Sequence, residues 1–201
     1  MTNWQNKWNV RYHSPDYVYG KEPNAFLVES EPWLKGKNVL CVADGEGRNG
    51  VWLASKGYVV TSIDYSSEGL QKARNLAGKN GVEVTTLCAD LLEVELVPET
   101  YNGIIIMYSH FVENEATRLF EKYKKALRPD GTIIFEAFSK NQMGKDSGGP
   151  KNIDLLYDPH FICESFSEFN IIYCKEQSVV LAEGTLHQGE ASVIRLVAQK
   201  R

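Results

Sequence analysis

Five apolar runs alternate with helix-like or loop segments over the first two thirds of the chain, and this alternation constrains the fold most. The runs cover residues 37–43, 58–64, 82–90, 101–109 and 132–138. The segments between them are long enough to carry the chain back to the same edge of a sheet, as parallel strands require. Such runs indicate a parallel sheet with both faces covered.

Apolar residues at helical spacing predict helices over residues 48–57, 66–81, 114–127 and 153–166. Two long strand-like runs, residues 169–184 and 191–200, lie so close together that they must form an antiparallel hairpin. The sequence therefore predicts one α/β domain with a Rossmann-like, doubly wound, seven-stranded sheet. The sheet is expected to be mostly parallel, with a reversed C-terminal hairpin strand.

The stretch VLCVADGEGRNG, residues 39–50, joins the first run to the first helix and contains the pattern G-x-G-x-x-G. Gly45 and Gly47 let the backbone approach a ligand, which this turn places at the carboxyl edge of the sheet. Asp44 and Glu46 bring two negative charges to the same loop. A like charge at about 4 Å costs several kcal/mol at an effective dielectric of about 20, so the loop disfavours a pyrophosphate.

Two further carboxylates stand where later strands end. Asp64 ends the second run, where a carboxylate accepts hydrogen bonds from both hydroxyls of a ribose. Asp90 ends the third run, where it suits an adenine amino group while Leu91 packs on the ring. A helix N-cap and a loop cap are the alternative interpretations of these two residues. With the acidic loop and the reversed hairpin, they favour S-adenosylmethionine, a cation without phosphate, over a nicotinamide dinucleotide.

The motifs VLCVADGEGRN, VVTSIDYS, LCADL, YNGIII and LRPDGTIIFEAF, in this order, resemble those of the class I S-adenosylmethionine-dependent methyltransferases. WNVRYHSPDYVYGKEPNAFL, QMGKDSGGP and LAEGTLHQGEASVIRLVAQK extend the resemblance to small bacterial methyltransferases of the tellurite-resistance (TehB-like) type. The chain departs from the superfamily pattern at three positions: an acid is usual at Cys41, Gly at Ala43 and Asp at Asn102. The first departure removes one common partner of the cofactor's ammonium group.

The resemblance implies a bound S-adenosyl-L-methionine, with S-adenosyl-L-homocysteine as product, and an N-terminal cap or lid (residues 1–36) over a methyltransferase domain (residues 37–201). We expect Arg48 to form an ion pair with Glu46, Asp16 or Glu22, and Tyr65 to stack on the adenine or to pack in the core. The residues expected at the cofactor are Tyr12, Tyr19, Ala43, Asp44, Gly45, Glu46, Gly47, Arg48, Asn49, Asp64, Tyr65, Asp90, Leu91, Met107 and Tyr108.

Two histidines are candidates for orienting the methyl acceptor. His110 follows the fourth strand, and His187 lies in the closing hairpin. The sequence shows no strong catalytic dyad, which fits a small soft acceptor such as a thiol or a chalcogen oxyanion like tellurite, because a soft anion needs no general base. A soft anion would be bound by these histidines as protonated groups or neutral donors. Residues 139–150 are expected to form a mobile cover with glycine hinges.

The net charge of −4 and the lack of a basic stripe argue against nucleic acid and anionic membranes as partners. No apolar run reaches membrane-spanning length and no leader is recognised, so a cytoplasmic location is expected. The four cysteines never form a C-x-x-C pair, so we expect reduced core cysteines and no metal. His13 and His160 are expected to be surface or packing residues. A monomer and a homodimer both remain open.

Two other classes of function remain. One is a nicotinamide-dependent oxidoreductase, which the acidic loop disfavours. The other is a non-catalytic module that binds an adenosyl cofactor without transferring its methyl group. Turnover of the cofactor to S-adenosylhomocysteine with some acceptor separates that module from a methyltransferase.

Overall fold

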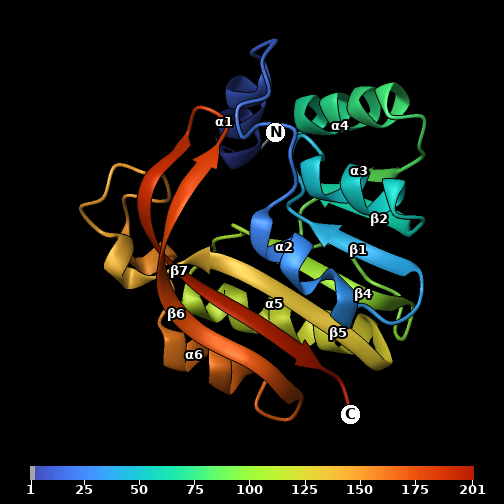
Figure 1. Ribbon diagram of the computed structural model, residues 1–201, viewed down its shortest axis with the longest axis vertical. Coiled ribbons are helices and arrows are strands. Elements are labelled where there is room, and N and C mark those ends of the chain that lie inside the picture. Colours follow the sequence, from blue (N-terminus) through green and yellow to red (C-terminus); the bar gives the residue numbers. More distant parts are fainter. Residues whose placement is uncertain (1–2) are drawn as a thin grey trace.

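A computed structural model describes residues 3–201, with side chains from Gln5 onward, so the first two residues of the predicted N-terminal segment lie outside it. Seven strands form one sheet in the order β3-β2-β1-β4-β5-β7-β6 (Figure 1). The neighbours from β3 to β5 pair in parallel, and β7 is antiparallel to both β5 and β6. The predicted doubly wound sheet with a reversed C-terminal hairpin strand is confirmed. The strands are β1 (Asn38–Val42), β2 (Val59–Asp64), β3 (Thr85–Cys88), β4 (Tyr101–Met107), β5 (Leu127–Phe138), β6 (Asn170–Glu183) and β7 (His187–Gln199).

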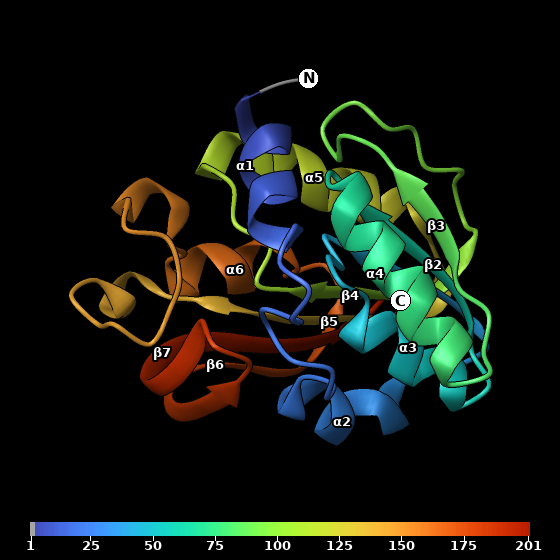
Figure 2. The same ribbon diagram turned by 90° about the horizontal axis from the view of Figure 1, so that it is seen from above.

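Helices cover both faces of the sheet, with α2 and α3 on one side and α5 and α6 on the other (Figure 2). The α-helices are α1 (Asn3–Tyr12), α2 (Ala25–Ser30), α3 (Arg48–Ser55), α4 (Ser67–Lys79), α5 (Glu113–Ala126) and α6 (Pro159–Ser165), and the short 3-10 helices are η1 (Glu31–Trp33), η2 (Lys140–Gln142) and η3 (Ile153–Leu155).

The strands bury both faces because successive side chains point to opposite sides of a sheet. In β1, Leu40 and Val42 join the core beneath α5 and α6, whereas Val39 and Cys41 join the core beneath α2 and α3. The buried carboxylates of the central strands stand toward the carboxyl ends, Asp64 in β2 and Glu136 in β5. The carboxyl ends of β1, β2 and β4 therefore meet at one polar edge.

Several predicted elements are wrong in extent. β5 begins at Leu127 and β7 at His187, five and four residues before the runs predicted over residues 132–138 and 191–200. The helix expected over residues 153–166 is split into η3 and α6, because Pro159 opens α6 and Asp158 caps it by accepting from the His160 amide. The strand expected over residues 82–90 shortens to β3, which lies at the edge of the sheet and is largely exposed.

The prediction of reduced core cysteines is wrong for two of the four. Cys163 of α6 and Cys174 of β6 form a disulfide across a sequence separation of 11 residues. The pairing is not apparent from the spacing of the cysteines, because the two residues come together only when α6 packs against the edge strand. Cys41 is free and buried, as expected, whereas Cys88 is free but exposed.

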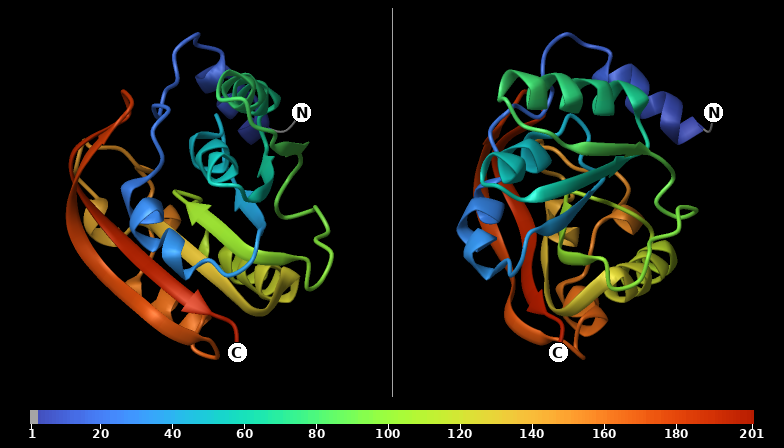
Figure 3. Two further views of the ribbon diagram at one scale, coloured as in Figure 1. Left: turned by 45° about the vertical axis from the view of Figure 1, so that its right-hand side comes forward. Right: turned by 90° about the vertical axis from the view of Figure 1, so that its right-hand side faces the viewer.

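The β6–β7 hairpin extends past the end of the sheet and reaches the N-terminal segment (Figure 3). The amide of Thr185 in the hairpin turn donates to the carbonyl of Val18 at 2.9 Å. Gly184 fits closely against Gly20, and a Cβ on Gly184 would lie 2.2 Å from the Val18 carbonyl oxygen. Residues 18–20 therefore bridge the hairpin turn and the Gly-rich loop, which closes a ring of chain around the carboxyl edge of the sheet.

Candidate functional site

A cleft of about 670 Å³ opens at the carboxyl edge of the sheet, beneath the N-terminal segment. Its volume lies within the range usual for cofactor and small-molecule sites. The cleft brings together most of the predicted site residues: Tyr12, Tyr19, Ala43, Asp44, Glu46, Arg48, Asn49, Asp64, Tyr65, Asp90, Leu91, Met107, Tyr108, His110 and His187.

Gly45 and Gly47 do not line the cleft, although both were predicted at the cofactor. Both adopt positive φ angles, 54° and 84°. A Cβ on Gly47 would lie 2.5 Å from the Cβ of Ala73 in α4, and one on Gly45 would lie 2.6 Å from the Tyr12 hydroxyl. Their role is to shape the loop and let α1 and α4 approach it. Ala43 also has a positive φ, 51°, at the position where the superfamily usually has Gly.

Asp64 is held rigidly at the end of β2. Its Oδ2 accepts from the Gly45 amide and its Oδ1 from the Ser66 amide, both at 2.8 Å. Burial raises the pKa of Asp64 to about 6, against the lowering effect of these amides. Because a carboxylate has about four acceptor positions, two remain for the hydroxyls of a ligand.

Asp44 is turned mainly toward the protein. Its Oδ2 accepts from the Ser62 hydroxyl at 2.6 Å, and the Gly50 amide lies 3.4 Å from its Oδ1. Burial raises the pKa of Asp44 to about 7. A cation bound nearby would favour the charged form of this group.

Glu46 is already neutralised, which corrects the expectation of a free negative charge in the loop. Its Oε1 lies 2.5 Å from the ammonium of Lys72, and its Oε2 accepts from the Tyr19 amide. Lys72 also donates to the carbonyls of Ser14 and Asp16. Glu46 therefore fastens the N-terminal segment to α4 rather than leaving its charge free for a ligand.

At the opposite end of the cleft, Asp90 and Leu91 follow β3. The Oδ1 of Asp90 accepts from the Leu92 amide at 2.9 Å, so Asp90 serves as a loop cap and leaves its other oxygen for the cleft. Leu91 is buried and packs in the core beneath α5. Tyr65 also lines the cleft, and it follows β2, the strand next to β3.

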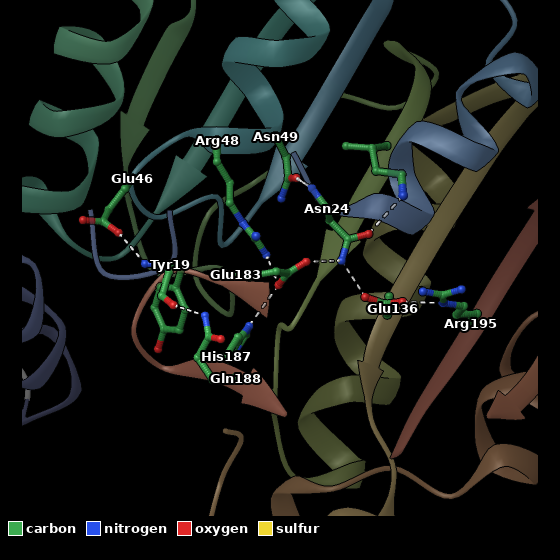
Figure 4. Close-up of polar contacts among 12 residues, drawn as sticks. Tyr19, Asn24, Glu46, Arg48, Asn49, Glu136, Glu183, His187, Gln188 and Arg195 are labelled. Carbon is green, nitrogen blue, oxygen red and sulfur yellow. Dashed lines mark hydrogen bonds and ion pairs between the residues drawn. The ribbon is translucent and has the colours of Figure 1, made fainter. Parts of the chain in front are cut away.

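Arg48 pairs with a residue that the sequence did not suggest. Its Nη2 lies 2.8 Å from Oε2 of Glu183 in β6 (Figure 4). Among the described residues it forms no ion pair with the predicted partners Glu46, Asp16 or Glu22. The same Oε2 lies 3.2 Å from Nδ1 of His187.

Glu183 is thus the centre of a buried polar network. Its Oε1 accepts from Nδ2 of Asn24 at 3.3 Å, and Asn24 also donates to Glu136, which pairs with Arg195 (Figure 4). The hydrogen bonds from His187 and Arg48 outweigh burial and lower the pKa of Glu183. The network connects α3, β5 and both strands of the hairpin around one carboxylate.

Both candidate histidines line the cleft and lie between aromatic rings. His187 contacts Tyr19, Tyr108 and Phe138, with ring centroids 4.7, 4.5 and 5.3 Å away. His110 stacks between Phe138 and Tyr157 at 5.6 and 5.5 Å. Its Nδ1 lies 2.7 Å from the carbonyl oxygen of Leu155, and burial lowers its pKa to about 4.

Three buried polar atoms in this region make no hydrogen bond within residues 3–201: Nη1 of Arg48, the hydroxyl of Tyr108 and Nε2 of His110. Buried polar groups in native proteins are almost always hydrogen-bonded. Tyr108 also has a φ of 53°, a strained conformation for a residue with a side chain. Unsatisfied groups and backbone strain at one end of a cleft are typical of a site that awaits a ligand.

The N-terminal segment covers the cleft with aromatic rings. Tyr12 is buried, stacks on Trp8 at 5.6 Å and places its hydroxyl over Gly45. The Tyr19 hydroxyl accepts from Arg11 at 2.8 Å. Tyr17 instead donates to the Lys72 carbonyl outside the cleft.

The loop of residues 139–150 is fastened to β7. Ser147 donates to the Glu190 carbonyl at 2.6 Å, and Gln142 accepts from the Ser192 amide at 2.9 Å. Only Gly149 and Pro150 of this loop line the cleft. That this loop is a mobile cover stays a prediction. Opening of the loop would break these hydrogen bonds to β7.

The sequence missed several cleft residues, namely Lys7, Arg11, Ser109, Phe138, Lys151 and Leu155, together with Glu183 behind the wall. His13 and His160 are exposed, as expected. Within residues 3–201 no helix is long and apolar enough to cross a membrane. The same residues hold no group of three or more His, Cys, Asp or Glu that suits a metal ion.

Comparison with known proteins agrees with the fold and the cleft. A family model described as a methyltransferase domain matches residues 39–131. The uncharacterized methyltransferase YbaJ of Bacillus subtilis is 30% identical over 105 residues, which are 51% of this chain and 41% of that protein. The chain spans less than half the length of the curated relatives that match it first.

Solved structures share the fold at low sequence identity. TehB from Haemophilus influenzae has a TM-score of 0.74 at 15% identity, covering 98% of this chain and 67% of that one. A structure from work on the conversion of a disulfide bond into a thioacetal group during echinomycin biosynthesis has a TM-score of 0.79 at 16% identity, covering 98% and 92%. Magnesium protoporphyrin IX methyltransferase from Synechocystis, solved with bound SAH, has a TM-score of 0.65 at 16% identity, covering 98% and 83%.

Residues 39–131, a little under half of the chain, match a methyltransferase domain, and the fold of the chain is that of solved S-adenosylmethionine-dependent methyltransferases. Among these structures its fold resembles that of TehB. The cleft fits S-adenosylmethionine, the cofactor of those proteins, in chemistry, because carboxylates stand at the strand ends.

Proposed function

We propose that the protein transfers the methyl group of S-adenosylmethionine to a small-molecule acceptor with a soft nucleophilic atom, a thiol or a chalcogen oxyanion such as tellurite. The observation that carries this proposal is the division of the cleft. Strand-end carboxylates, Asp64 and Asp90, occupy one part, and an aromatic pocket around Tyr108, Phe138 and His187 occupies the other. That pocket suits a small, weakly hydrated group rather than a polymer.

In this proposal Asp64 holds the ribose, Asp90 the adenine amino group and Tyr65 the adenine face. The cofactor supplies an activated methyl group, so the protein has to align the acceptor and keep water out. The N-terminal segment serves as the lid, with Tyr12 and Tyr19 over the cofactor. Its attachment through Glu46 and Lys72 supports this assignment, because the attachment joins the segment to the Gly-rich loop itself.

The acceptor class is supported by the resemblance to TehB and by the sulfur chemistry named for the echinomycin structure. A nicotinamide dinucleotide is disfavoured by the buried carboxyl group of Asp44 in the Gly-rich loop, whose pKa is already raised by burial. A pyrophosphate beside it would raise the electrostatic cost further.

Calorimetry tests the cofactor assignment. We expect S-adenosylmethionine and S-adenosylhomocysteine to bind, and NAD and NADP not to bind. An acceptor screen that reads homocysteine release then tests transfer, with 2-mercaptoethanol, selenite and tellurite as probes. Binding of NAD alone would overturn the assignment, and binding of S-adenosylmethionine without turnover of any acceptor would favour a non-catalytic module.

A further inference from the structure

The two histidines of the acceptor pocket have their ring protons fixed by the protein. Nδ1 of His110 faces the Leu155 carbonyl, and Nδ1 of His187 faces the Glu183 carboxylate. Both partners are acceptors only, so each Nδ1 carries the proton. In the neutral ring Nε2 then has a lone pair and no proton. Nε2 of His110 is buried and makes no hydrogen bond within the described residues, and the hydrogen bond of the His187 ring is made by its Nδ1.

Both rings are neutral near pH 7. Burial lowers the pKa of His110 to about 4, and burial together with the Arg48 cation lowers the pKa of His187 despite Glu183. The pocket therefore presents two bare acceptor nitrogens. This arrangement is opposite to the expected role of the histidines as hydrogen-bond donors to an anion. It favours a methyl acceptor that itself donates a proton or a hydrogen bond to these nitrogens.

The two histidines differ in the partner behind them. A carbonyl cannot compensate a charged ring, whereas the Glu183 carboxylate stabilises an imidazolium directly. The Glu183 side chain is only 14% exposed, and its charge is stabilised by Arg48 at 2.8 Å and Asn24 at 3.3 Å. His187 is therefore the ring that is built to take a proton, and His110 is the ring that accepts a hydrogen bond.

We propose that the Glu183–His187 pair is the proton acceptor of the reaction and that the methyl acceptor is a small protonated thiol, with Glu183 as the positioning residue (Figure 4). The proposal rests on the proposed methyl transfer and chooses between its two acceptor classes. As the thiol sulfur forms its bond to the methyl carbon, the bond between that carbon and the sulfonium sulfur breaks and its electron pair stays on that sulfur. The thiol proton passes to Nε2 of His187.

A thiol fits this pocket better than an alcohol. The walls around His187 are the rings of Tyr19, Tyr108 and Phe138, which offer little hydration to a hydroxyl. An ordinary thiol has a pKa of about 8.5, whereas an alcohol holds its proton far more strongly, so a thiol passes its proton to an imidazole such as His187 more readily than an alcohol does.

Several titratable or charged groups face His187, and the test has to account for all of them. Glu183 and Glu136 raise its pKa, while Arg48 lowers it. His110 is coupled to it electrostatically, and the phenols of Tyr19 and Tyr108 pack on its ring. The Glu183→Gln variant removes one of these charges and nothing else from this set.

The experiment compares a protonated and an ionised acceptor in the same enzyme. The probes are 2-mercaptoethanol, 5-thio-2-nitrobenzoate, which is already a thiolate at neutral pH, and selenite. We expect Glu183→Gln to lower turnover of 2-mercaptoethanol about 10–100-fold and to move the rise of rate with pH to lower pH, because the imidazolium loses its partner. Turnover of 5-thio-2-nitrobenzoate should change less than about threefold.

His187→Asn is the second variant, because it leaves Glu183 paired with Arg48 if Glu183→Gln fails to fold. It should lower turnover of 2-mercaptoethanol by about 10²–10⁴-fold, the usual contribution of a general base, and spare the thiolate. Glu190→Gln is the matched control, since Glu190 lies in the same hairpin, pairs with Lys145 and is exposed. It should behave like the wild type on every probe.

A readout without turnover completes the test. Nitrogen chemical shifts of the His187 ring should show a proton on Nδ1 in the wild type, and Glu183→Gln should lower the pKa of that ring. Equal losses on the thiol and the thiolate, or a ring protonated on Nε2, would overturn the proposal. Turnover of selenite with no turnover of any protonated thiol would also overturn it while leaving the methyltransferase assignment intact. No turnover of any acceptor would refute both.

Discussion

Replacing Asp64 by Asn separates the stability of the Gly-rich loop from its affinity for the cofactor. The carboxylate accepts two backbone amides, from Gly45 and Ser66, on different oxygens. An Asn side chain has one acceptor oxygen, so one amide loses its partner and faces an NH₂ group. Losing a hydrogen bond to a charged, buried acceptor costs about 1.5–3 kcal/mol.

The same substitution removes a buried charge. The pKa of Asp64 is raised from 3.8 to about 6, and the charged form therefore costs about 3 kcal/mol at pH 7.5. The two effects nearly cancel, so the free energy of unfolding should change by less than about 1.5 kcal/mol. Nothing offsets the loss at the ribose, where two hydroxyls lose a charged acceptor. Affinity should fall about 10–150-fold, which corresponds to about 1.5–3 kcal/mol.

Urea unfolding and calorimetry with S-adenosylhomocysteine at pH 7.5 measure the two quantities on one preparation. Asp146→Asn is the control, because its side chain is fully exposed in the loop before the cleft. It should leave both quantities unchanged. A folded Asp64→Asn variant with wild-type affinity would refute the ribose assignment.

Three further predictions concern the surroundings of the cleft. The pKa of Asp44 lies above its unfolded value, so the folded state binds more protons, and the free energy of unfolding without ligand should fall as the pH rises from about 4 through about 7. Asp44→Asn should flatten this dependence in urea unfolding at pH 5 and 8, and it should raise the free energy of unfolding at pH 8 by about 1–3 kcal/mol. Lys72→Met leaves the buried Glu46 carboxylate unpaired, so it should cost about 3–5 kcal/mol and speed proteolysis within residues 13–20; unchanged cleavage would contradict the attachment of that segment. Reducing the Cys163–Cys174 disulfide, or replacing both residues by Ser, should lower the free energy of unfolding by about 2–3 kcal/mol and leave cofactor affinity unchanged. A loss of affinity would show that the disulfide supports the cleft.

The sheet was predictable because its information is local. Runs such as residues 101–109 are apolar on both faces, and the hydrophobic pattern alone marks them as buried strands. The carboxylates at the strand ends follow from the same pattern, since parallel strands end at one edge. The break of the helix predicted over residues 153–166 was also readable, because Asp158 and Pro159 form an N-cap and first-turn pair.

The polar network was not predictable, because its members are far apart in the chain. Arg48 and Glu183 are separated by 135 residues, and several carboxylates nearer in sequence were equally plausible partners. The tautomers of the two histidines depend on Leu155 and Glu183, which no motif singles out. The sequence pattern predicts the edge of the sheet where the cleft lies. Which polar groups at that edge already have hydrogen-bond or ion-pair partners within the protein depends on how distant segments pack.

The contact between Val18 and Thr185 has a consequence for how the protein reaches its native state. The two residues are 167 positions apart, and the hydrogen bond between them closes the ring of chain around the cleft. Closing so long a loop is entropically costly and slow, so it is expected after the local β-α-β units have formed. During synthesis the sheet edge therefore exists before its ligand-binding cleft does. A ligand in the finished cleft should slow amide hydrogen exchange at both positions together, which would make these two distant segments one cooperative unit.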